Sequence, residues 1–137
     1  MYISRNVADT IEYAKQFSQG LKGGETILLI GDLGAGKTHF AKGIALGLDV
    51  TDTVTSPTFT LHNVYYGRLT LNHFDFYRLT DPEEAVVLGL NEYFSCDKAV
   101  AVIEWSENVS ELLPSGCITV SIKVIDESAR QIDIIGI

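Results

Sequence analysis

Residues 26–38 read Thr-Ile-Leu-Leu-Ile-Gly-Asp-Leu-Gly-Ala-Gly-Lys-Thr, and they are the most informative part of the chain for its fold. Within it, residues 31–38 match the phosphate-binding loop pattern G-x-x-x-x-G-K-[ST] at every fixed position. The apolar, β-branched run 26–30 predicts a strand, and an amphipathic pattern from Lys37 to about Leu48 predicts a helix. Strand, glycine-rich loop and helix in this order are typical of phosphate-loop proteins. The stretch therefore predicts nucleotide binding on an α/β fold.

The loop itself carries the groups that hold a triphosphate. Gly31, Gly34 and Gly36 let the backbone curl so that successive N–H groups point at an anion. The positive end of the following helix adds to this cradle. The ammonium of Lys37 would reach the β- and γ-phosphates, and the hydroxyl of Thr38 would ligate Mg²⁺. The alternative is a chance match in a glycine-bearing turn, which average residue usage gives in roughly one chain in a few hundred.

Composition limits the remaining possibilities. A chain of 137 residues predicts one domain over residues 1–137. The formal net charge of -8 argues against direct binding of DNA or RNA, which needs a basic surface. Cys96 and Cys117 lie far apart and are expected to be reduced, buried thiols of a cytoplasmic protein. Neither a membrane span nor a signal core is expected, since apolar runs are short and Asp9 and Glu12 interrupt the N-terminus.

The rest of the chain predicts a three-layer phosphate-loop NTPase-like fold, a mixed β-sheet with helices on both faces. Gly43 and Gly47 are expected to weaken the helix after the loop. The other expected elements are a helix over 7–19 capped by Asn6, a Thr-rich loop over 51–60, a hairpin of strands 61–66 and 69–74 around Gly67, a short helix starting at Pro82 behind the cap Asp81, a buried central strand 99–103, and an antiparallel pair 118–124 and 131–135 that closes the sheet.

An acid follows the buried central strand, in the order Ala99-Val100-Ala101-Val102-Ile103-Glu104-Trp105. In phosphate-loop proteins a carboxylate at the end of a neighbouring strand holds Mg²⁺, usually through water. The carboxyl end of a parallel strand is also where ligands bind in open α/β sheets. Glu104 is therefore a candidate metal ligand. The alternative is an ordinary strand-end acid that faces solvent.

A second acid stands in the segment 73–78, which reads His-Phe-Asp-Phe-Tyr-Arg at the end of a predicted strand. Asp75 could orient or deprotonate an attacking water, and Arg78 could pair with phosphate or with Asp75. On spacing alone, an ordinary amphipathic strand end is the favoured explanation of the segment. His73 is expected to be a satisfied, partly buried ring and not a ligand.

The loop 53–60 reads Thr-Val-Thr-Ser-Pro-Thr-Phe-Thr and follows the phosphate-loop helix. Nucleotide switches commonly place a hydroxyl-bearing loop here, which the γ-phosphate and Mg²⁺ bring to order. A plain Ser/Thr/Pro loop is the alternative.

Four motifs together resemble a known family. GDLGAGKT at 31–38, SPTF at 56–59, HFDFYR at 73–78 and IEW at 103–105 follow the order and spacing of the TsaE (YjeE) family. The resemblance implies a bacterial ATPase that acts with TsaB and TsaD to install threonylcarbamoyl on the adenosine beside the anticodon of tRNAs reading codons that begin with A. It implies that ATP hydrolysis resets the complex and does not activate the threonylcarbamoyl group, and that tRNA is met only through that complex.

The resemblance also implies roles for individual residues. Mg²⁺ would be held by Thr38 and Glu104, and Asp75 matches the essential acid of the family. Glu104 and Lys37 would serve catalysis as well as binding. The residues implied to contact ATP or ADP are Gly34, Ala35, Gly36, Lys37, Thr38, Trp105 beside the site, Thr58 in the switch-like loop, and Thr10 and Arg130 at the adenine. The chain departs from the family pattern at His39, where a second Thr is common, and at Ser106, where Pro is common. We assign no role to His39.

Three other functions are alternatives to an ATPase. A GTPase would need a guanine-selecting N-K-x-D segment, which the sequence lacks. A small-molecule kinase would need a lid and several arginines that clamp both phosphates. The chain has Arg5, Arg68, Arg78 and Arg130, of which Arg78 alone lies in a site motif. A nucleotide-gated interaction module without hydrolysis would have the same loop and switch, and the sequence leaves it open.

Overall fold

A seven-stranded mixed sheet forms the centre of the part of the chain that the computed structural model describes, residues 1–57 and 59–136. The strand order is β1-β7-β6-β2-β5-β4-β3. β2 is parallel to β6 and β5, and β5 to β4, whereas β7, β1 and β3 pair antiparallel. The strands are β1 (Tyr2–Ser4), β2 (Thr26–Ile30), β3 (His62–Tyr65), β4 (Thr70–Asp75), β5 (Ala99–Glu104), β6 (Ile118–Val124) and β7 (Arg130–Ile135).

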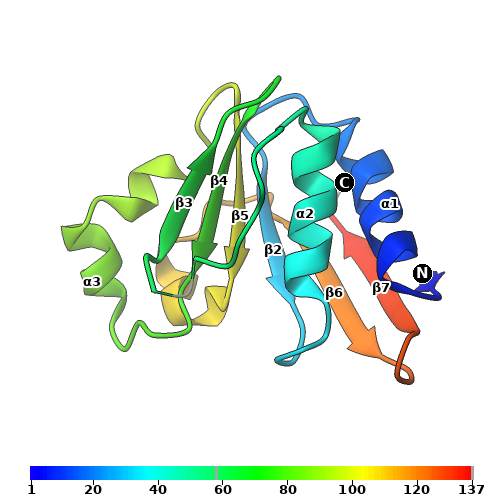
Figure 1. Cartoon of the computed structure of the whole chain (residues 1–137). Helices are drawn as coiled ribbons and strands as arrows, with labels where there is room; N and C mark the ends of the chain where they lie inside the picture. The colour runs from blue at the N-terminus through cyan, green and yellow to red at the C-terminus, as the bar shows by residue number, and fades with distance from the viewer. Residues whose placement is uncertain (58, 137) are drawn as a thin grey trace.

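Helices cover the two faces of this sheet unequally. α1 (Val7–Ser18) and α2 (Lys37–Gly47) lie side by side on one face, in front of β6 and β7 in Figure 1. The short helix α3 (Pro82–Val87) and the 3₁₀ helices η1 (Leu90–Tyr93) and η2 (Ser106–Leu112) serve the other face. The parallel strands β2, β5 and β6 all point to the lower edge in Figure 1, where the phosphate loop joins β2 to α2.

Residues 99–103 of β5 are all apolar because both faces of this strand are buried. Val100 and Val102 belong to the core cluster under α1 and α2, whereas Ala101 and Ile103 belong to the cluster on the opposite face. Side chains alternate between the faces of a strand, and here both faces are covered. The one acid of β5, Glu104, is its last residue and stands at the edge of the sheet where the parallel strands end.

The predicted elements are largely confirmed. Strand 26–30 has the predicted bounds, Asn6 caps α1 by accepting from the Asp9 amide, and α3 begins at Pro82 with a capping box between Asp81 and Glu84. The hairpin and the central strand are shifted by one residue at their ends. No helix among the described residues is long and apolar enough to cross a membrane.

Two expectations were wrong. The pair β6 and β7 does not close the sheet, because β1 adds an antiparallel edge strand beyond β7. β1 is three residues long, too short for an alternating pattern to be recognised. Cys96 and Cys117 are half-buried instead of buried, although both are free thiols as expected.

Arg68, in the turn between β3 and β4, ties this hairpin to the helices. Its guanidinium donates to the carbonyls of Leu21 at 2.8 Å, Ser18 at 3.0 Å and Gly47 at 3.1 Å. The last carbonyls of a helix lack partners within it and carry partial negative charge. One arginine therefore satisfies the ends of both α1 and α2.

The glycines of α2 permit the close contact between α1 and α2. A Cβ built on Gly43 would come within 2.5 Å of Ala14 Cβ, and one built on Gly47 would lie 2.6 Å from the Lys15 carbonyl oxygen and against the Ser18 hydroxyl. The expected loss of helix propensity is thus accompanied by a packing role, because only glycine fits where the two backbones meet.

Gly47→Ala is therefore expected to destabilise the protein by about 1–3 kcal/mol through overpacking, although alanine favours a helix by about 1 kcal/mol over glycine. The control is Gly20→Ala, where the new Cβ would lie 3.7 Å from its nearest neighbour, the Phe17 carbonyl oxygen. The control is expected to stay within about 0.5 kcal/mol of the wild type. Urea denaturation measures both values, and a stabilised Gly47→Ala protein would contradict the packing argument.

Candidate functional site

The phosphate loop spans the turn between β2 and α2. Gly34 and Gly36 have φ of 81° and 109°, a left-handed conformation that favours glycine. A Cβ built on Gly34 would meet no atom within 4 Å, so the loop opens to free space on that side. The backbone and the N-terminus of α2 thus form a concave cradle of the kind that binds anions.

Arg130, the first residue of β7, braces this loop from the side. Its Nε donates to the Ala35 carbonyl at 2.9 Å, and its Nη1 donates to the carbonyls of Asp126 and Ala129 at 2.8 and 2.9 Å. The guanidinium therefore joins the β6–β7 turn to the middle of the phosphate loop. The two residues of this contact are 95 positions apart in the sequence, so a local sequence pattern could not predict it.

Two cavities meet at the loop, and Gly34, Gly36 and His39 line both of them. The phosphate cavity, of about 230 Å³, is lined by Leu33, Gly34, Gly36, Lys37, Thr38, His39, Ser56, Asp75, Glu104 and Trp105. The side cavity, of about 460 Å³, is lined by Asn6, Val7, Ala8, Thr10, Gly34, Gly36, His39, Glu127, Ser128 and Arg130. Together they provide adjoining spaces, one among charged side chains and one against α1.

The two candidate acids lie next to each other in the phosphate cavity. Asp75 and Glu104 are register partners at the ends of the parallel strands β4 and β5, and both are buried, with exposed fractions of 5% and 4%. The Tyr77 amide donates to Asp75 Oδ1 at 3.0 Å. The sequence motifs at 31–38, 73–78 and 103–105 thus converge on one cavity, as the carboxyl ends of neighbouring parallel strands must.

His73 differs from its prediction as a satisfied, partly buried ring. The ring is completely buried, and its Nε2 lies 2.7 Å from Glu104 Oε2. Its Nδ1 has no hydrogen-bond partner among the described residues. His73 stands two residues before Asp75, so both side chains leave the same face of β4. That alternation was the signal in the sequence that could have placed His73 beside the two acids.

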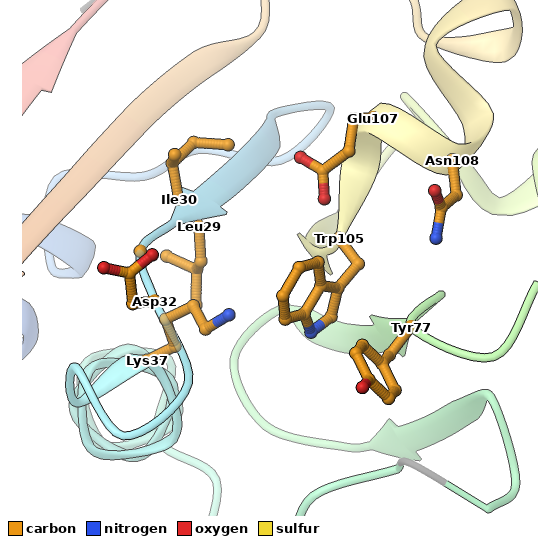
Figure 2. A pocket seen from close by; sticks show the side chains of 9 residues that line it. Leu29, Ile30, Asp32, Lys37, Tyr77, Trp105, Glu107 and Asn108 are labelled. Carbon is orange, nitrogen blue, oxygen red and sulfur yellow. The ribbon is translucent and has the colours of Figure 1, made fainter.

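Lys37 and Trp105 form a wall of the phosphate cavity. Lys37 Nζ lies 4.3 Å from the centre of the Trp105 ring, and the centre of the Tyr77 ring lies 4.9 Å from it (Figure 2). Trp105 adopts φ 58° and ψ 44°, a left-handed conformation that costs a tryptophan free energy and recurs at functional sites. Beyond this wall lies a third cavity, of about 490 Å³, which Asp32 and Glu107 also line.

The donors in the phosphate cavity suit Mg²⁺ but do not form a complete metal site. Thr38 and Glu104 offer oxygen atoms, which Mg²⁺ prefers. Within residues 1–57 and 59–136 no group of three His, Cys, Asp or Glu side chains could hold a metal by itself. Since Mg²⁺ usually keeps several waters and binds substrate phosphates, a partial set of protein ligands fits a nucleotide-bound ion.

The switch-like loop 51–60 connects to the strand end that carries Asp75. The Asp75 amide donates to the Leu61 carbonyl at 3.0 Å, and the Leu61 amide donates to the Pro57 carbonyl at 2.7 Å. The Arg78 guanidinium lies 4.5 Å from the centre of the Phe59 ring. Thr58, the predicted switch residue, lies outside the described residues. Two backbone hydrogen bonds through Leu61 therefore connect this loop to Asp75.

Thr10 and Arg130 do come together, although they are far apart in the sequence. Both line the side cavity, where the Thr10 hydroxyl shares a hydrogen bond with Ser4 Oγ at 2.5 Å. Their position next to Gly34 and Gly36 agrees with a place beside a nucleotide. Their contact with adenine stays a prediction, as do the roles of the other site residues.

Comparison with known proteins gives the family. The family model described as threonylcarbamoyl adenosine biosynthesis protein TsaE matches residues 4–132. The chain belongs to the TsaE family. It is 42% identical to the tRNA threonylcarbamoyladenosine biosynthesis protein TsaE of Treponema pallidum, over 96% of this chain and 97% of that protein. The TsaE protein of Bacillus subtilis is 42% identical over 93% of this chain and 79% of its own length.

A solved structure supports the same assignment. The crystal structure of Bacillus subtilis YdiB superposes with a TM-score of 0.81 and 37% identity, over 96% of this chain and 80% of that one. The predicted family and the predicted phosphate-loop NTPase-like fold, a mixed sheet flanked by helices, are therefore confirmed. The TsaE family takes part in tRNA threonylcarbamoyladenosine biosynthesis.

Proposed function

We propose that this chain is the ATP-binding and ATP-hydrolysing subunit that acts with TsaB and TsaD to form threonylcarbamoyladenosine in tRNA. One observation carries the proposal: the phosphate loop, Asp75 and Glu104 line a single cavity. Family membership supplies the pathway, because the relatives bear the name of this tRNA modification. In this proposal hydrolysis resets the complex for another round, in the cytoplasm.

The residues of the phosphate cavity divide the work of binding and hydrolysis. The loop amides and the Lys37 ammonium would hold the β- and γ-phosphates, while Thr38 and Glu104 would hold Mg²⁺. When bound, Mg²⁺ neutralises charge that develops on the phosphates during transfer. Asp75 would orient the attacking water or accept its proton. Burial of both carboxylates strengthens their interaction with any charge in the cavity.

The side cavity is the proposed place of the adenine and ribose. It adjoins the loop glycines and is large enough for part of a nucleotide, with Thr10 and Arg130 in its wall. Trp105 would flank the phosphates through its contact with Lys37. We place Thr58 beside the γ-phosphate only by the family resemblance.

Protein partners, and not tRNA alone, are the proposed binding targets. A net charge of -8 disfavours the phosphate backbone of RNA, so tRNA would be met only through the TsaB–TsaD complex. Backbone hydrogen bonds connect the 51–60 loop to Asp75. A nucleotide that contacts Asp75 could therefore change the conformation of this loop and so the binding of a partner. ATP can change docking only if the docked and free forms contact its γ-phosphate differently.

The arrangement of the arginines disfavours a small-molecule kinase. Arg68 is bound to helix-end carbonyls and Arg130 to the loop carbonyl of Ala35, so neither is available as a phosphate clamp without breaking these contacts. A nucleotide-gated module without hydrolysis differs from our proposal only in turnover. Phosphate release from ATP, measured with the protein alone and with TsaB and TsaD, separates the two.

Nucleotide state is expected to control partner binding. Affinity for the TsaB–TsaD complex should differ at least several-fold between an ATP analogue, ADP and no nucleotide, as measured by calorimetry, and the isolated chain should not bind tRNA tightly. Equal partner affinity in all three nucleotide states would refute the switch.

Depletion of the protein in its host is expected to lower the amount of threonylcarbamoyladenosine among the tRNA nucleosides. An unchanged amount would refute the pathway assignment.

A further inference from the structure

His73 lies behind the phosphate cavity, in contact with one of its acids. The ring is fully buried on β4, and its Nε2 is 2.7 Å from Oε2 of Glu104 on the adjacent strand β5. Glu104 lines the phosphate cavity, whereas His73 is not among the described residues that line it. The ring therefore touches the proposed magnesium ligand from the protein side.

The environment of the ring selects one tautomer. Nδ1 is buried and has no hydrogen-bond partner among the described residues, so a proton there would have no acceptor. A proton on Nε2 points at a carboxylate oxygen, which accepts hydrogen bonds. The ring thus carries hydrogen on Nε2 and donates it to Glu104 Oε2.

The two partners are also held by rigid elements. Asp75 is the register partner of Glu104, and His73 is the register partner of Val102, on neighbouring parallel strands in the middle of the sheet. Neither side chain can turn far, because both are buried and attached to paired backbone. The hydrogen bond between His73 and Glu104 Oε2 therefore restrains the rotation of the carboxylate and does not use its second oxygen, Oε1.

We infer that His73 is a positioning residue for Glu104, which holds the carboxylate in the orientation that receives Mg²⁺ with the nucleotide. The inference rests on the proposed function. Outer partners that orient a metal ligand typically change metal affinity by about 10–100-fold when they are removed. The sequence favoured a structural histidine at this position, and the contact gives it a part in the site.

Two substitutions separate the hydrogen bond from the volume of the ring. His73→Met replaces the ring with an apolar side chain of similar size that has no hydrogen-bond donor. His73→Gln provides an N–H donor at a similar distance from the backbone as the ring Nε2. The matched control is His62→Met on β3, which removes a histidine whose Nε2 lies 2.9 Å from Asn72 Oδ1, away from the phosphate cavity. Each variant is first compared with the wild type by thermal unfolding.

The readout is binding of a non-hydrolysable ATP analogue over a series of Mg²⁺ concentrations and in EDTA. His73→Met is expected to raise the Mg²⁺ concentration that gives half of the maximal increase in analogue binding by about 10–100-fold. Its affinity for the analogue in EDTA should be unchanged. His73→Gln should stay within a few-fold of the wild type, and His62→Met should match it. In a Glu104→Gln background, His73→Met should add nothing, since it acts through that carboxylate.

The outcomes that overturn the inference differ from those that overturn the function. If the wild-type protein binds the nucleotide with the same affinity with and without Mg²⁺, the proposed metal site and this inference are both refuted. Normal Mg²⁺ dependence in the wild type and in a folded His73→Met variant would refute the inference alone, as would an equal loss in EDTA. Should His73→Met not fold, His73→Asn, whose amide is too short to reach Glu104, replaces it against His73→Gln under the same criteria.

Discussion

Replacement of Lys37 by alanine is expected to weaken ATP binding by about a hundredfold or more. A hydrogen bond to a charged group contributes about 1.5–3 kcal/mol, and two phosphates lose such a partner together. Since about 1.4 kcal/mol corresponds to a tenfold change in affinity, the loss exceeds what most other single side chains could cause. Lys37 stands at the first position of α2 and contacts Trp105 at the edge of the cavity, so the fold should survive.

Lys42→Ala is the control for this variant. It removes the same charge from the same helix, on the surface near Ile11 and Asp52 and away from the phosphate cavity. Calorimetry with ATP and Mg²⁺ on both folded variants measures the difference. Near-normal affinity of Lys37→Ala would mean that the loop is not the nucleotide site.

Asp75→Asn is expected to reduce turnover by about 10²–10⁴-fold, the usual contribution of a general acid or base. Affinity for ATP should change little, because the amide oxygen of asparagine can still accept the hydrogen bond from the Tyr77 amide. Steady-state phosphate release under conditions where the wild type turns over, with partners if they are needed, gives kcat and KM separately.

Glu104→Gln is the contrast, because it is expected to lower Mg²⁺-dependent binding and turnover together. The substitution removes negative charge next to the proposed metal while keeping the shape of the side chain. The two acids are neighbours in register, so their different effects would come from role and not from location. Equal losses of affinity in both variants, with normal turnover at saturation, would refute this division.

Local pattern was enough to predict most of the fold. The run 26–30, the Asn6 cap and the capping box at Asp81 each involve residues close in sequence, and each element formed where the pattern placed it. Strand β1 was not predicted, because three residues are too few to show an alternating pattern. Its place at the edge of the sheet depends on pairing with β7, over a hundred residues later.

The site was only partly predictable for the same reason. Lys37, Asp75 and Glu104 were found by motif, and the parallel strands bring them together. The hydrogen bond from His73 depends on β4 lying directly beside β5, a strand order that spacing along the chain does not specify. The contact from Arg130 to Ala35 likewise needs β7 to fold back past the loop.

The position of Trp105 has a practical consequence. It is the chain's single tryptophan, and an ammonium group rests 4.3 Å from the centre of its ring. All indole emission of the protein therefore originates beside the lysine that we propose to hold the phosphates. A phosphate that draws this ammonium away would change the electric field at the indole. The unlabelled protein thus contains an intrinsic fluorophore for following nucleotide arrival in real time.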